Sequence, residues 1–139
     1  MKNKITYRDN PEKDVRQIQN VLETWKQLLN SRMEENVLLK NKISEIVKNN
    51  YDQNSLEEIE EFQTQFIIED ELIHSLRMDV IELDNLLYNQ VFEDEKTGRL
   101  FDTKLENLRR DIANSVTRFH ILQSAFDDFQ HKISRKREK

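Results

Sequence analysis

Hydrophobic residues recur along the chain at alternating spacings of three and four positions. Such spacing keeps apolar side chains on one face of an α-helix, as in coiled coils. Three runs have this pattern: Val15, Ile18, Leu22, Trp25, Leu29, Leu39, Ile43 and Ile46; then Ile59, Phe62, Phe66, Ile73, Leu76, Val80, Leu83 and Leu87; then Leu105, Leu108, Ile112, Phe119, Leu122, Phe126, Phe129 and Ile133. The pattern predicts three long helices, each with one buried stripe.

Helix-capping residues suggest where these helices begin and end. Asn10 before Pro11 is typical of a helix start, so we predict a first helix at about 11–48. Ser55 and Glu58 have the spacing of a capping box, which predicts a second helix at about 55–94. A third helix is predicted at about 99–136, after the charged segment that ends at Gly98. Residues 1–10 are expected to form an irregular arm.

Short connections near 49–54 and 95–98 make neighbouring helices antiparallel. The predicted fold is therefore all-α, an antiparallel up-down-up bundle of three long helices with coiled-coil-like packing. Residues 11–139 form one domain in this prediction, with a short basic C-terminal tail. Association of two or more chains through helical hairpins would use the same pattern, so a homo-oligomer remains open.

Composition excludes several kinds of functional site but does not identify a function. The 139 residues include one Gly, one Pro and no Cys. Glycine-rich phosphate loops, disulfides, thiolate metal sites and cysteine nucleophiles are therefore excluded. No window approaches the ~18 apolar residues of a membrane span, and no signal peptide is recognisable at the N-terminus. We expect a cytoplasmic, non-enzymatic protein without a cofactor.

Charge is distributed unevenly among the three predicted helices. Residues 1–50 carry a net charge of +3, residues 51–97 carry −12, and residues 98–139 carry +4. This distribution favours ion pairs between the acidic middle helix and its two basic neighbours, although each exposed pair contributes less than ~1 kcal/mol.

Polar residues interrupt the stripes at one level of the bundle. Arg32 and Asn36 fall on the stripe of the first helix, Glu69 falls on that of the second, and Gln123 of the third lies near this level. Asn36 and Glu69 should meet across an antiparallel connection. One interpretation is a buried polar layer that fixes register, and another is a small ligand site. The sequence favours a third, a stutter that rotates neighbouring apolar residues into the core.

Without a stutter, four apolar residues beside the polar positions would remain outside as a mid-bundle patch able to dock another helix or a second copy. They are Val37, Leu38, Ile67 and Ile68, joined by Ile81 and Ile121. A second candidate surface is the acidic face of the middle helix, which could steer a basic partner. Its residues are Glu57, Glu60, Glu61, Asp70, Asp79, Glu82 and Asp84. Our leading hypothesis is a protein-binding module or scaffold that uses one of these surfaces.

Histidines offer an alternative chemistry. Glu71 and His74 have the Glu-x-x-His spacing that di-iron bundles use, but His120 lacks a matching carboxylate, so a complete metal site is not expected. The segment His74-Ser75-Leu76-Arg77 resembles phospho-accepting segments of two-component phosphotransfer bundles, although Met78 replaces the glycine that follows there. This resemblance implies a phosphoryl-accepting histidine.

The C-terminal segment HKISRKREK concentrates positive charge and could contact phosphate groups. Cations at the end of a helix also complement its dipole, and no aromatic residue interleaves them as in single-strand binders. Because the whole chain is acidic, nucleic acid is an unlikely partner in this interpretation.

Overall fold

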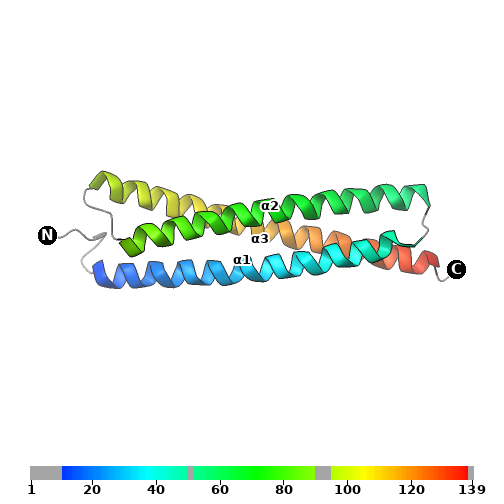
Figure 1. The fold of residues 1–139 in the computed structure, drawn as a ribbon, viewed down its shortest axis with the longest axis horizontal. Coiled ribbons are helices and arrows are strands. Elements are labelled where there is room, and N and C mark those ends of the chain that lie inside the picture. The colour runs from blue at the N-terminus through cyan, green and yellow to red at the C-terminus, as the bar shows by residue number, and fades with distance from the viewer. Residues whose placement is uncertain (1–10, 50–51, 90–94, 138–139) are drawn as a thin grey trace. The chain divides into compact units, whose positions relative to one another are not determined.

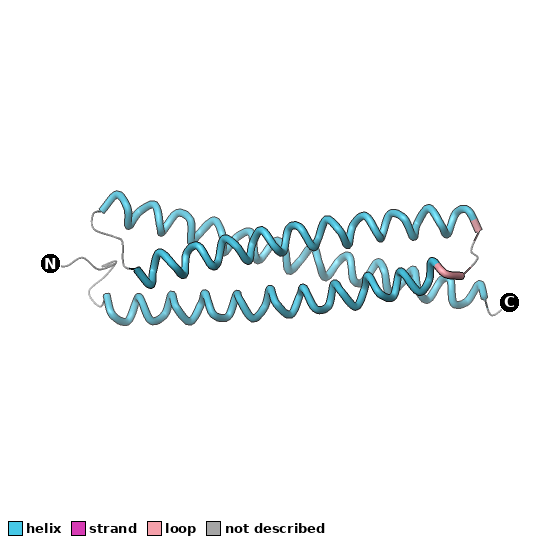
Figure 2. Tube along the Cα trace, in the orientation of Figure 1, coloured by secondary structure: helices cyan, strands magenta, loops and turns pink. Residues whose placement is uncertain are grey.

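The computed structural model describes residues 11–49, 52–89 and 95–137. These residues form three α-helices, α1 (Pro11–Val47), α2 (Gln53–Asn89) and α3 (Glu95–Arg137), with no strand in the described ranges (Figure 1). Figure 2 shows that almost all the described trace is helical. The predicted antiparallel three-helix fold is confirmed. None of the described helices contains a stretch long and apolar enough to span a membrane.

The chain divides into two compact units, each with segments of all three helices. The first unit comprises residues 1–31 and 74–113, and the second comprises 32–73 and 114–139. In the second unit, α2 and α3 are joined by the pairs Glu58–Lys132 and Glu69–Arg118. As residue numbers rise along α2 they fall along α3, so these two segments are antiparallel.

Each unit has its own hydrophobic core, built from the predicted stripes. The first unit buries Leu22, Trp25, Leu29, Leu76, Val80, Leu83, Leu87, Phe101, Leu105, Leu108 and Ile112. The core of the second unit contains Leu39, Ile43, Ile46, Ile59, Phe66, Phe119, Phe126, Phe129 and Ile133. Its aromatic rings pack closely, with the centroids of Phe66 and Phe126 5.2 Å apart. Burying one such side chain contributes roughly 1.5–3 kcal/mol, which makes these stripes the main source of stability.

The start of α2 differs from the prediction. The Oδ1 atom of Asp52 accepts a hydrogen bond of 2.8 Å from the backbone N–H of Ser55, and the carbonyl of Asp52 accepts from Leu56 N–H. Asp52 is therefore the N-cap, and α2 begins two residues before the predicted Ser55. The predicted capping box is wrong, because Ser55 is buried in the first turn and Glu58 pairs with Lys132.

The other helix ends can be compared only in part. α1 begins at Pro11, whereas the arm 1–10 and the predicted cap Asn10 lie outside the described residues. α2 is described to Asn89, and its predicted extension to 94 also lies outside them. α3 begins at Glu95, before the predicted 99, so Gly98 lies in its first turn. A single glycine costs a helix only about 1 kcal/mol, which the packed stripe that follows can offset.

Candidate partner-binding surface

Two polar residues on the hydrophobic stripes, Asn36 and Glu69, are buried and not rotated outward, and Arg32 is partly buried. Asn36 is 0% exposed and Glu69 is 2% exposed, whereas the neighbouring Val37 and Ile67 are 47% and 55% exposed. The favoured stutter is therefore wrong, and a polar layer lies in the second unit. The helices keep their three-four spacing because these polar groups find partners inside the unit.

Asn36 joins α1 to α2 through its side-chain amide. Its Nδ2 atom donates a hydrogen bond of 2.9 Å to the backbone carbonyl of Phe66 and one of 2.6 Å to Oδ1 of Asp70. The other oxygen of Asp70 accepts from Lys40 Nζ. Asn36 was expected to meet Glu69, but its hydrogen bonds go to Phe66 and Asp70.

Glu69 joins α2 to α3 through a charge-assisted hydrogen bond. The Nε atom of Arg118 donates to its Oε2 at 2.7 Å. The Glu69 side chain is 2% exposed and that of Arg118 is 42% exposed, so a buried carboxylate meets a guanidinium that reaches in from the rim. The sequence pointed to Gln123 at this level, but Arg118 is the residue that satisfies Glu69.

The second polar residue on the α1 stripe, Arg32, is held at this layer by two contacts. Its Nη1 atom donates 2.7 Å to Oε1 of Glu35, and its guanidinium lies over the ring of Phe119 at 5.5 Å from the centroid.

Among the residues that the structure describes, three buried side-chain atoms of the second unit have no hydrogen-bond partner: Nε of Arg32, Oδ1 of Asn36 and Oε1 of Glu69. Buried polar groups are nearly always paired, and leaving one unpaired costs about 1–3 kcal/mol. Natural proteins keep such groups mainly where they have a use, so the surroundings of Glu69 are of particular interest.

Ion pairs between helices follow the predicted charge pattern. In the first unit, Asp84 and Glu82 of α2 pair with Lys26 of α1 and Lys104 of α3, at 2.6 Å and 3.6 Å. In the second unit, carboxylates of α2 again pair with cations of its two neighbours: Asp70 with Lys40, Glu69 with Arg118 and Glu58 with Lys132. The negative charge of α2 is thus used partly to hold its neighbours.

This pairing divides the predicted acidic surface. Asp70, Glu82 and Asp84 are engaged by Lys40, Lys104 and Lys26 within the protein. By contrast, Glu57, Glu60 and Glu61 are exposed or partly exposed on neighbouring turns of α2 and form no ion pair among the described residues. Asp79 is also exposed and lies in the first unit, so within the second unit these three form the available part of the predicted acidic surface, which we call the acidic triplet.

Asp79 lies in a different electrostatic setting. Partial desolvation raises the pKa of its carboxyl above the ordinary 3.8, and the nearby carboxylates of Glu82 and Asp111 raise the pKa further. Lys104 acts in the opposite direction. Asp79 and Asp111 bring like charges together between α2 and α3, so this part of the first unit carries electrostatic repulsion.

The predicted apolar residues are all exposed. Besides Val37 and Ile67, these are Leu38, Ile68, Ile81 and Ile121. Two of them line separate grooves of the second unit. Ile67 lines a groove of about 610 Å³ between α1 and α2, with Ile43, Lys40 and Glu60. Ile121 lines a groove of about 350 Å³ between α2 and α3.

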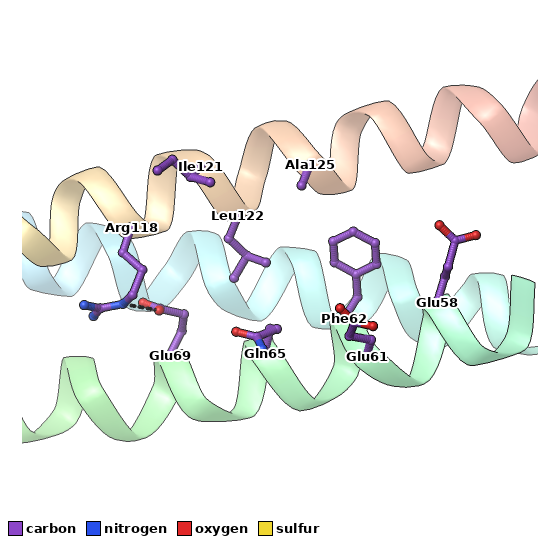
Figure 3. A pocket seen from close by; sticks show the side chains of 9 residues that line it. All are labelled: Glu58, Glu61, Phe62, Gln65, Glu69, Arg118, Ile121, Leu122 and Ala125. Atoms are coloured by element: carbon purple, nitrogen blue, oxygen red, sulfur yellow. Dashed lines mark hydrogen bonds and ion pairs between the residues drawn. The ribbon is translucent and has the colours of Figure 1, made fainter.

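The α2–α3 groove has an apolar floor and a polar rim (Figure 3). Phe62, Leu122 and Ala125 line its apolar part, while Glu58 and Glu61 lie at one end and the Glu69–Arg118 pair lies at the other. Sequence analysis identified Ile121 and the acidic residues but missed the groove. It also missed Arg118, and it missed the buried residues Phe101 and Ser115, which a strict continuation of the three-four spacing would have placed on the stripe.

The histidine sites remain incomplete in the structure. Glu71, His74 and His120 are all exposed. Within the described ranges, no group of three or more His, Cys, Asp or Glu residues is placed to hold a metal ion.

Comparisons of this chain with protein-family models, with curated proteins and with solved structures find no match.

Proposed function

We propose that this chain is a non-enzymatic helical-bundle module that binds another protein in the cytoplasm. The acidic triplet of Glu57, Glu60 and Glu61 supports this proposal most directly. Asp84, Asp70 and Glu82 of α2 form ion pairs with Lys26, Lys40 and Lys104, whereas these three exposed carboxylates form no ion pair with any residue that the structure describes.

The position of the triplet adds to its potential as a binding surface. Glu61 lines the α2–α3 groove and Glu60 lines the α1–α2 groove, so both of these grooves have at their edge a carboxylate that forms no ion pair with a described residue. Negative charge next to apolar surface attracts a basic partner and then gives it hydrophobic contacts. Charge supplies the speed and selectivity of such an encounter, and apolar burial supplies most of its affinity.

Charge reversal of the triplet tests this function. The variant Glu57→Lys/Glu60→Lys/Glu61→Lys should lose the basic proteins that the unmodified chain isolates from its native cells, and binding to those proteins should weaken as salt is raised. The matched control is Glu106→Lys/Asp127→Lys/Asp128→Lys, which makes the same change in net charge with exposed residues of α3. Equal recovery of the same proteins by both variants would refute the proposal.

A further inference from the structure

The α2–α3 groove exists because two short or flexible side chains border it. Phe62 and Leu122 are only partly buried, unlike the fully buried Phe66 and Phe126 nearby. Gln65 and Ala125 border Phe62 and Leu122, and the methyl group of Ala125 is too small to cover them. Apolar surface that the second unit could have covered itself is thus left open.

Negative charges at the groove outnumber positive charges. Glu58, Glu61 and Glu69 line it, together with the cation Arg118. Arg118 pairs with Glu69, and Lys132 pairs with Glu58 at 2.9 Å. Glu61 forms no ion pair within the described ranges, so the described charges at this groove have an excess of one negative charge.

Glu69 gives a second and independent indication of positive charge in the occupant. Its side chain is 98% buried and lines the groove, yet no residue in the described part of the chain donates a hydrogen bond to Oε1. A carboxylate oxygen in a poorly solvated place keeps a strong field, because little water screens it. A cation placed in the groove could pair with Glu61 and would also lie in the field of Glu69.

We propose that the α2–α3 groove of the second unit receives a basic amphipathic helix of the partner protein. This inference rests on the proposed function and names the partner's chemistry. The groove follows α2 from Glu58 to Glu69, a length of roughly 16 Å at 1.5 Å per residue, which matches three turns of a helix. Apolar residues of the partner at i, i+4 and i+7 cover Phe62, Leu122 and Ala125, and flanking lysine or arginine residues face Glu61 and Glu69.

Synthetic peptides test the groove directly. The probe is a fluorescein-labelled helical peptide of about 18 residues with leucines at i, i+3, i+4 and i+7 and lysine or arginine on both flanks. One comparison peptide replaces the basic residues with glutamate, and another replaces the leucines with serine. Anisotropy measures affinity, and amide chemical shifts locate the contact. The basic peptide should bind at least about tenfold more tightly than either comparison and should shift signals of Phe62, Leu122 and Ala125.

Two variants of the protein make the test specific to this groove. Ala125→Leu fills the groove and should weaken binding of the basic peptide at least about tenfold. Ala113→Leu is the matched control, since it adds the same atoms at another exposed alanine of α3, and it should leave affinity unchanged. Glu69→Gln removes the charge with little change of shape and should weaken binding about threefold to tenfold. Circular dichroism confirms that each variant is folded.

The outcomes separate this inference from the proposed function. If Ala125→Leu and Ala113→Leu bind the basic peptide equally, or if the peptide does not bind, the groove assignment is overturned. The proposed function nevertheless stands if triplet reversal still abolishes capture of basic proteins. Sedimentation that shows a dimer dissociated by Ala125→Leu would also overturn the assignment, because a second copy would then occupy the groove. If triplet reversal has no effect on partners, the proposed function itself fails.

Discussion

Arg118 of α3 donates a hydrogen bond of 2.7 Å through Nε to Oε2 of Glu69, the carboxylate that interrupts the hydrophobic stripe of α2. The buried carboxylate of Glu69 therefore depends on the more exposed Arg118 for compensation of its charge. A buried ion pair is weak evidence for net stability, but removing one partner leaves an uncompensated charge and is strongly destabilising.

We therefore expect Arg118→Met to lower the free energy of unfolding by about 2–4 kcal/mol, as measured by urea denaturation. Arg110→Met is a suitable control, because Arg110 is exposed and its hydrogen bond within the described ranges is to Asn107 on its own helix. It should change stability by no more than about 0.5 kcal/mol.

The double variant Arg118→Met/Glu69→Leu removes both charges. It should be as stable as the unmodified chain, or more stable, since apolar residues of similar volume often replace a buried pair without loss. A double variant as unstable as Arg118→Met alone would contradict the idea that the unpaired charge causes the damage.

Asn36 should contribute more to the choice of helix register and oligomeric state than to stability. Its Nδ2 donates to the carbonyl of Phe66 and to Asp70, but its buried Oδ1 has no hydrogen-bond partner among the described residues. A polar residue on a coiled-coil seam commonly fixes register and the number of helices at some cost in stability. We expect Asn36→Leu to leave the free energy of unfolding unchanged or raise it by up to about 1 kcal/mol. Sedimentation should then show mixed oligomers; a destabilised, strictly single species would contradict this expectation.

The stripes were predictable from spacing because a three-four repeat determines which side chains face inward. Phe66, Leu83 and Phe126 are buried as expected. The same repeat placed Asn36 and Glu69 on the stripe. The stutter was favoured instead because the sequence indicates the cost of burying a polar group but not whether a partner can reach it.

The hydrogen-bond partners of the buried polar residues were harder to predict. Arg118 lies beside the α3 stripe, and only its long side chain brings the guanidinium to Glu69. Predicting that contact requires the register between α2 and α3 to within one turn. The groove over Phe62 depends on the same register, since it places the small Ala125 next to Gln65. The acidic residues were predictable, but which of them are paired was not.

The cap of α2 can be tested by single substitutions. Asp52→Ala should lower the free energy of unfolding by about 1 kcal/mol, because the N–H of Ser55 loses its side-chain acceptor. Asp52→Asn should cost only a few tenths of a kcal/mol, since the amide oxygen can accept the same bond. The control is Asn54→Ala, two residues later and exposed. If Asn54→Ala were as damaging as Asp52→Ala, the effect would not come from the cap.

Asp79 should make the free energy of unfolding fall as pH rises. A paired carboxylate has the opposite effect. Desolvation, Glu82 and Asp111 raise its pKa above 3.8 in the folded chain, so the folded state binds more protons than the unfolded state just above that pH. Stability from this group is present at lower pH and is lost as pH rises through the folded-state pKa.

The ionised Asp79 is therefore unfavourable at pH 7, and Asp79→Asn should raise the melting temperature there. Because the side chain is exposed and screened by water, the gain should not exceed about 0.5 kcal/mol. Glu23→Gln, which removes an exposed carboxylate of α1 that has no acidic residue three or four positions away, is the control and should have a smaller effect. Melting curves from pH 3 to pH 8 should show the gain from Asp79→Asn disappearing below pH 3.8, where Asp79 is protonated in both states. If Asp79→Asn still stabilises the chain at pH 3, relief of charge repulsion is not the cause of the stabilisation.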